Sequence, residues 1–195
     1  MKNYLTTLGI TLTFALPHAA HAQTVTPPPV PANIQVPAPN QAFLLGRAFG
    51  TQNYVCQPGD TLGRVVWTLF TPQATLFGDQ DEQLTTHFFS PNPFENQLVR
   101  AAWQDSRDTS TFWGRVVASS LDPNFVSPGA IPWLLIERAG VQAGPTGGGT
   151  LAGTTFIQRL NTEGGVAPST GCSVPTDLGR KAFVPYTADY FFYKQ

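Results

Sequence analysis

The stretch that decides the fold is LVRAAWQDSRDTSTFWGRVVA, residues 98–118. Two short runs, LVRAAWQ (98–104) and TFWGRVVA (111–118), flank the polar segment 105–108, which holds turn-forming Asp and Ser. Both runs contain the Val, Thr, Phe and Trp that are typical of strands, and neither is long enough for a regular amphipathic helix. This stretch predicts two antiparallel strands joined by a polar loop.

The same pattern extends over the rest of the chain. About ten short apolar runs alternate with Gly, Pro, Asn and Asp turn signals, at 42–49, 52–56, 64–70, 74–77, 84–89, 98–104, 111–118, 133–140, 150–160 and 188–193. This predicts an all-β single domain, an antiparallel β-sandwich or barrel with about ten short strands and little helix. The last run, ADYFFY, is apolar on both faces, so we expect that strand to be covered on both.

Composition excludes several classes of protein. Charged residues make up only 12% of the 195, and the formal net charge is −1, which leaves no basic surface for nucleic acid. The 14 Phe, 5 Tyr and 4 Trp argue against disorder.

The N-terminus has the three parts of a secretory signal peptide. Basic Lys2 precedes an apolar stretch (4–16), and small residues at Ala20 and Ala22 precede Gln23. We expect cleavage after Ala22 and export to the periplasm or the medium. The apolar stretch is too short to span a bilayer, and no later segment predicts a transmembrane span.

The chain then divides into two further parts. Residues 23–40 form a Pro-rich spacer, which could hold the domain away from a surface or lie along it. Residues 41–195 form the single β-rich domain. Removal of residues 1–22 leaves His87 as the last histidine, so the sequence predicts no multi-histidine metal site and no cofactor. Cys56 and Cys172 are an even pair in an exported chain, which favours a disulfide over two free thiols.

Catalytic candidates are few. His87 could form a triad with Asp105 and a nearby serine, but no G-x-S-x-G nucleophile elbow is present. Any two of the carboxylates Asp105, Asp108, Glu137 and Asp189 could act as a pair on a polysaccharide, with Asp105 and Asp108 as the candidates in the loop 104–111. A single histidine in a strand is more often a structural residue, so an enzyme is the minority interpretation.

Trp103 and Trp113 give the best candidate for a ligand patch. They flank the polar loop 104–111, which also carries Arg107, and flat indole faces can stack on sugar rings. The alternatives are that the indoles belong to the core and that Arg107 and the aspartates only tie the loop together.

Two stretches resemble known functional motifs but lack the structural context that those motifs need. Residues 54–62 look like the opening of a LysM module, which binds peptidoglycan, but they continue into a strand instead of a helix. GGGTLAG (147–153) fits a loose dinucleotide pattern outside any βαβ unit, so we reject an NAD-dependent dehydrogenase and expect a glycine loop between strands.

Five blocks carry a resemblance: GTQNYVC (50–56), WTLFTPQATLF (67–77), GTTFIQRLNT (153–162), GVAPSTGC (165–172) and VPYTADYFFY (184–193). From about Pro31 to Lys194 the chain resembles an uncharacterised secreted family of bacteria and fungi, classed as a domain of unknown function. The resemblance implies one domain and pairing of Cys56 with Cys172, but no activity. Some fungal relatives bear a malate dehydrogenase label, which the failed dinucleotide motif does not support.

Together these observations predict a secreted or periplasmic, non-catalytic binding or envelope-associated β domain. The favoured ligand is carbohydrate, either a glycan or another cell-envelope component, bound through Trp103, Trp113 and Arg107. One alternative is a hydrolase that acts on cell-wall or plant polysaccharide through carboxylates of the loop 104–111. The other is a structural or interaction protein.

Overall fold

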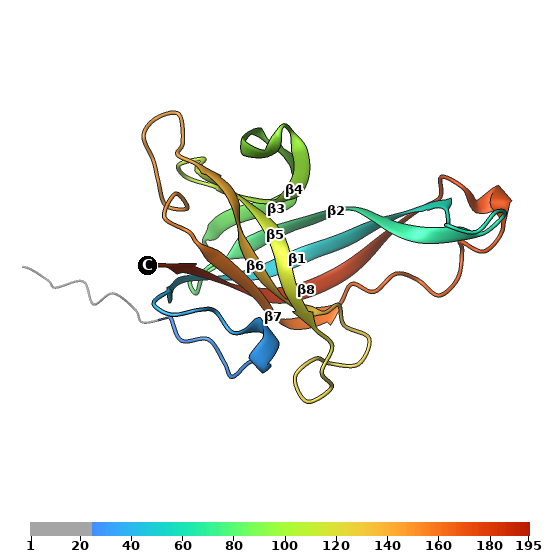
Figure 1. The fold of residues 1–195 in the computed structure, drawn as a ribbon, viewed down its shortest axis with the longest axis horizontal. Coiled ribbons are helices and arrows are strands. Elements are labelled where there is room, and N and C mark those ends of the chain that lie inside the picture. The colour runs from blue at the N-terminus through green and yellow to red at the C-terminus, as the bar shows by residue number, and fades with distance from the viewer. Residues whose placement is uncertain (1–24) are drawn as a thin grey trace, which may run out of the picture.

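The described residues form one closed antiparallel barrel in which each strand pairs with the next and β8 returns to β1 (Figure 1). A computed structural model describes residues 25–195, so the predicted signal peptide (1–22) lies outside it. The elements are η1 (Ala32–Ile34), β1 (Gln41–Pro58), β2 (Val65–Phe77), β3 (Gln83–Asn92), η2 (Pro93–Glu95), β4 (Leu98–Asp105), β5 (Thr111–Ser120), β6 (Trp133–Gln142), β7 (Phe156–Gly164), η3 (Pro175–Asp177) and β8 (Lys181–Lys194). The prediction of an all-β single domain is confirmed, with the barrel as its form.

The strands number eight in this part of the chain, not about ten, because two pairs of predicted runs fuse. The runs 42–49 and 52–56 continue through Gly50 as β1. A Cβ at Gly50 would overlap the backbone of Gln73 and Ala74, so this glycine permits close approach of β2 and does not end the strand. In the same way, 64–70 and 74–77 continue through Pro72 as β2.

Strand β8 is covered on both faces, as its sequence predicts. Tyr190 and Phe192 belong to the cluster that fills the barrel. Phe191 and Tyr193 belong to a second cluster on the outside. Alternation along one strand therefore supplies two separate cores.

The outer core is closed by the Pro-rich segment. Ile34, in η1, is fully buried there, and its carbonyl oxygen accepts a hydrogen bond from Gln158 Nε2 at 2.7 Å. Asn33 Nδ2 donates to the carbonyl oxygen of Ser119 at 2.8 Å. Residues 25–40 thus lie along the barrel (blue in Figure 1), and this part of the predicted spacer is packed on the domain.

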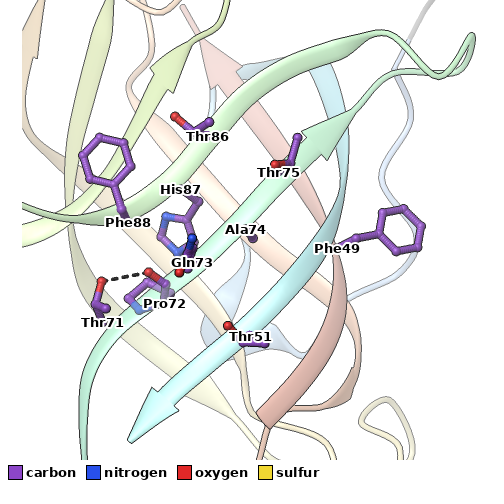
Figure 2. Close-up of a pocket in the computed structure, with 10 residues that line it drawn as sticks. All are labelled: Phe49, Thr51, Thr71, Pro72, Gln73, Ala74, Thr75, Thr86, His87 and Phe88. Carbon is purple, nitrogen blue, oxygen red and sulfur yellow. Dashed lines mark hydrogen bonds between the residues drawn. The ribbon is translucent and has the colours of Figure 1, made fainter. Parts of the chain in front are cut away.

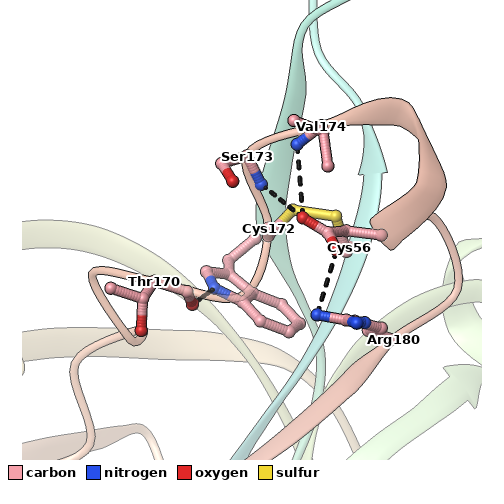
Figure 3. Close-up of a disulfide and its surroundings, with 8 residues drawn as sticks. Cys56, Thr170, Cys172, Ser173, Val174 and Arg180 are labelled. Carbon is pink, nitrogen blue, oxygen red and sulfur yellow. Dashed lines mark hydrogen bonds and ion pairs between the residues drawn. A yellow bond between two sulfur atoms is a disulfide. The ribbon is translucent and has the colours of Figure 1, made fainter.

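A disulfide joins Cys56 and Cys172, as predicted, with their Cα atoms 5.5 Å apart. It ties the end of β1 to the connection between β7 and β8 (Figure 3). In that connection the Asp177 carboxylate accepts hydrogen bonds from the backbone N–H groups of Ser173 and Val174 and pairs with Arg180 at 3.0 Å. These amide hydrogen bonds lower the pKa of Asp177.

Two kinds of feature are absent from the part of the chain that the structure describes. No helix between residues 25 and 195 is long and apolar enough to cross a membrane. Over the same range, no group of three or more His, Cys, Asp or Glu side chains is placed to hold a metal ion.

Candidate functional site

One end of the barrel is plugged by the connection between β6 and β7, residues 143–155, here called the plug loop. Leu151 is fully buried and packs with the residues that fill the barrel. Its backbone N–H donates to Ser110 Oγ at 3.0 Å, and the N–H of Thr150 donates to Asp108 Oδ2 at 2.8 Å. A Cβ at Gly148 would overlap the side chain of Asp108, which explains why glycine stands there. The motif GGGTLAG is therefore part of a loop between strands.

The carboxylates of the loop 104–111 organise the loop itself. Asp105 Oδ1 accepts hydrogen bonds from the N–H groups of Arg107 and Asp108, both at 2.9 Å. Asp108 Oδ1 accepts from the N–H of Ser110 at 2.8 Å. Burial opposes ionisation of Asp108, but hydrogen bonds from Ser110 and Thr150 outweigh burial and lower its pKa. Of the two interpretations of these aspartates, the geometry fits the structural one.

The proposed indole patch does not form, because Trp103 and Trp113 lie on opposite faces of the barrel wall. Trp103 is 1% exposed and lies inside, with its ring 5.9 Å from that of Phe112. Trp113 is 6% exposed and lies outside beneath Phe94, at a ring distance of 6.2 Å. Trp113 pairs with Ala102, the neighbour of Trp103, so side-chain alternation separates the two indoles. Neither indole offers an exposed face beside Arg107, which lies on the surface of the loop.

His87 is buried inside the barrel, where its ring stacks on Trp103 with a centroid distance of 4.1 Å. Its Nδ1 lies 2.9 Å from the carbonyl oxygen of Ala102, and because a carbonyl only accepts, Nδ1 carries the proton. Burial lowers the pKa of His87 to about 3, so the ring is neutral at pH 7. Within residues 25–195 the ring makes no hydrogen bond to a serine or an aspartate, so no triad is assembled.

At the opposite end, the barrel wall opens along two seams. The pairing of β2 with β3 ends at Ala74 and His87, and that of β4 with β5 ends at Ala101 and Gly114. Beyond these points β3 and β4 pair with each other, and the tip of this hairpin folds back over the outer face of the wall, where Phe94 packs against Trp113 and close to Gly140. This end is therefore splayed.

Pro72 contributes to the first seam. It has no N–H group, so it cannot donate a ladder hydrogen bond where β2 leaves β3. On the other side of the seam, the N–H of Phe89 in β3 donates a hydrogen bond to the hydroxyl of Thr71 at 3.1 Å instead of to a backbone carbonyl. A single proline thus helps to open the wall.

Inside the splayed end lies a cavity of about 240 Å³, here called the inner cavity. Most of its lining is apolar, and Leu69 and Val116 lie at an exposed rim. Its polar and aromatic lining comes from five different strands, as Gln52, Tyr54, His87, Trp103, Arg159 and Tyr190. The splayed strands give a small apolar molecule a route from solvent into the barrel.

Two residues that line the inner cavity, Gln52 and Trp103, have a donor without a partner in the described chain. Gln52 is 3% exposed, and its Nε2 has no hydrogen-bond partner in the described part of the chain; the same holds for Trp103 Nε1. Arg159 donates from Nε and Nη2 to the carbonyl oxygen of Pro132, at 3.2 and 2.8 Å. Among the described residues, no Asp or Glu lines the cavity. Buried donors without acceptors are uncommon in folded proteins, and a ligand is one way to satisfy them.

A second, wider groove of about 670 Å³ runs outside the first seam (Figure 2). It is lined by threonines and by Phe49, which is exposed. His87 and Pro72 border both the groove and the inner cavity, so they form the wall between them. The inner cavity is the stronger candidate because it is the more enclosed and because two residues with buried donors that lack partners in the described chain, Gln52 and Trp103, line it.

Fold and site together define an up-and-down β-barrel with one plugged end and a cavity at the other. The chain belongs to the family described as "Protein of unknown function (DUF3455)", which matches residues 37–194. No curated protein and no solved structure matches the chain.

Arg159, Gln52 and Tyr190 belong to no sequence motif that predicts a binding site. One signal was available, because Arg159 stands two residues after Ile157 in the strand run 150–160. It therefore shares the inward face of β7 with an apolar residue, and an inward-facing charge in a strand suggests a functional site.

Proposed function

We propose that this protein is an exported, non-catalytic binding protein that holds a small, mostly apolar ligand in its inner cavity. The observation that carries the proposal is the enclosed apolar cavity with buried donors that lack partners. Eight-stranded barrels either fill their interior with side chains or hold one small ligand. Here side chains fill the plugged end, and the splayed end has room for the ligand.

Export is supported by two independent features. Residues 1–22 have the pattern of a signal peptide, and Cys56 is bonded to Cys172. Structural disulfides persist mainly in oxidising compartments such as the periplasm or the medium. The ligand would therefore be met outside the cytoplasm.

The volume of the inner cavity limits the size of the ligand. An apolar cavity of about 150 Å³ holds benzene, so one of 240 Å³ suits about ten non-hydrogen atoms. A polymeric glycan does not fit this volume, and stacking on a sugar would need exposed indole faces that Trp103 and Trp113 do not offer. A small apolar molecule is therefore proposed in place of carbohydrate.

The hydrolase alternative is not favoured by the cavity. Its titratable side chains are His87, tyrosines and Arg159, with no carboxylate among the described residues that line it. The carboxylates of the loop 104–111 are engaged with backbone amides instead.

A cavity-filling variant tests the proposal. Ala101→Phe places a ring in the inner cavity, whereas Val99→Phe, two positions earlier on β4, adds the same ring at an exposed site that does not line it. Ligands of about ten atoms bind in roughly the millimolar to micromolar range, so ligand-observed NMR with phenylacetate, octanoate, 2-phenylethanol and 1-octanol is suitable. We expect wild type and Val99→Phe to bind at least one probe and Ala101→Phe to bind none. Equal binding by all three proteins would overturn the proposal.

A further inference from the structure

Arg159 is a charged side chain inside a barrel whose other interior residues are largely apolar. Two of its five guanidinium N–H donors bind the carbonyl oxygen of Pro132, which holds the side chain in place. No carboxylate of residues 25–195 lies within ion-pair distance of it. A partly buried guanidinium without a counter-ion is costly to maintain, so its position calls for a function.

The charge of Arg159 acts on the groups around the inner cavity. Burial raises the pKa of the Tyr54 and Tyr190 hydroxyls, and Arg159 opposes that rise for both. Burial lowers the pKa of His87, and the same charge lowers it further. The tyrosines and His87 are therefore neutral at pH 7, which makes Arg159 the fixed charge of the cavity among the described residues.

The nearby polar groups also suit a negatively charged ligand. Gln52 and Trp103 both line the cavity, and each has a buried N–H donor that makes no hydrogen bond in the described chain, although the amide of Gln52 lies beside the hydroxyl of Tyr186, whose pKa burial raises and this amide acts to lower. The hydroxyl of Tyr190 lies 3.3 Å from that of Tyr186, and the charge of Arg159 acts to lower the pKa of Tyr190 against the effect of burial. An anion would accept hydrogen bonds from these groups without meeting a carboxylate, since none lines the cavity.

We propose that the ligand of the inner cavity is a small monocarboxylate, with its apolar body against the barrel interior and its carboxylate on the guanidinium of Arg159. This inference rests on the proposed function and specifies its ligand class. The planar guanidinium suits a carboxylate because two parallel N–H donors can meet its two oxygens. The available volume favours a short aliphatic or a single-ring aromatic acid.

Matched probe pairs separate the contribution of the ligand's negative charge to binding from the contribution of its apolar body. Phenylacetate is compared with 2-phenylethanol, and octanoate with 1-octanol, by ligand-observed NMR and tryptophan fluorescence at pH 7. A charge-assisted hydrogen bond favours the acid over the alcohol by about tenfold to a hundredfold in Kd. Phenethylamine, a cation of similar size, is expected not to bind.

Substitutions test whether Arg159 causes the preference for acid over alcohol. In Arg159→Met, a residue of similar length without the charge, we expect the preference for acid over alcohol to vanish while the alcohol still binds. Binding of the alcohol also reports that the barrel is folded. Arg138→Met removes an exposed arginine from β6 and is expected to keep the wild-type preference. Arg159→Lys keeps the charge without the planar fork and is expected to retain part of the preference.

The possible results distinguish failure of the carboxylate inference from failure of the proposed binding function. A wild-type preference for the acids that is lost in Arg159→Met supports both. Equal binding of acid and alcohol by the wild type, or a preference that survives in Arg159→Met, overturns the carboxylate inference and leaves the binding function standing. If no probe binds the wild type, both are overturned.

Discussion

The two ends of the barrel treat their charged groups in opposite ways, although both ends hold buried polar atoms without a partner in the described chain, among them the hydroxyls of Thr85 and Thr154 at the plugged end. At the plugged end, Asp105 and Asp108 accept hydrogen bonds from backbone amides, and Leu151 fills the space behind them. At the splayed end, Gln52 and Trp103 keep donors without partners, and Arg159 has no counter-ion among the described residues.

This difference distinguishes polar groups that stabilise the fold from polar groups that are available to bind a ligand. The polar loop at the plugged end is conspicuous in the sequence, but the fold itself satisfies its carboxylates. The donors at the splayed end are scattered along the sequence, and the fold leaves them unsatisfied beside an apolar space. A binding site is better indicated by polar groups that the protein does not satisfy than by polar groups that cluster in a loop.

Shortening the buried side chain of the plug loop tests the plugged end of the barrel. It should give the largest loss in the free energy of unfolding. Leu151→Ala deletes a fully buried side chain, and we expect a loss of about 2–5 kcal/mol in the free energy of unfolding. Leu69→Ala, at the rim of the inner cavity, is the control and should cost much less because that side chain is partly exposed. Denaturant unfolding measures both. Equal losses would mean that the two ends do not differ in packing.

A pH series sharpens the comparison at the splayed end. The pKa of His87 is lowered from 6.5 in the unfolded chain to about 3 in the fold, so between these values the unfolded state binds the extra proton. Stability is therefore full above pH 6.5 and falls as the pH drops. This group alone should cost about 2 kcal/mol between pH 7 and pH 5.

The measurement is the difference in pH dependence between wild type and His87→Gln. Glutamine can still donate to the carbonyl of Ala102 but does not titrate, so the His87 contribution should disappear from its stability profile. Asp108 is not expected to contribute in this range, because its lowered pKa keeps it ionised in the fold. Identical profiles for the two proteins would show that His87 is not a buried neutral group.

A pair of polar substitutions gives the smallest effects and compares the two ends directly. Asp108→Asn weakens hydrogen bonds from Ser110 and Thr150 and should cost about 1 kcal/mol. Gln52→Leu removes a buried amide whose Nε2 has no partner in the described chain, so it should leave the free energy of unfolding near the wild-type value or raise it. Thermal and denaturant unfolding provide the readout. A large loss in the free energy of unfolding for Gln52→Leu would contradict the view that the Gln52 amide does not stabilise the fold and is available to a ligand.

Much of the fold could be predicted from local patterns. Short aromatic and β-branched runs identify strands, and the two-faced run 188–193 becomes β8, which is covered on both sides. The disulfide follows from an even cysteine count. The number of strands was overestimated because Gly50 and Pro72 are turn signals that here lie within continuous strands.

The candidate site could not be predicted in the same way. Gln52, His87, Trp103, Arg159 and Tyr190 come from five strands, and only closure of the barrel brings them to one cavity. Trp103 and Trp113 flank one loop, and this spacing predicts that they form one patch. Strand alternation sends them to opposite faces, and the direction of each side chain depends on a register that spacing alone does not reveal.

The indole resonances test the central claim most directly. Trp103 lines the inner cavity, whereas Trp67, Trp113 and Trp133 do not. In a ¹⁵N–¹H correlation spectrum of the protein, with resonances assigned by single Trp→Phe variants, titration with phenylacetate should shift the Trp103 Nε1–H signal until it saturates. The other three indole signals should stay in place. A shift confined to Trp67, Trp113 or Trp133, or no shift at all, would contradict binding in the inner cavity.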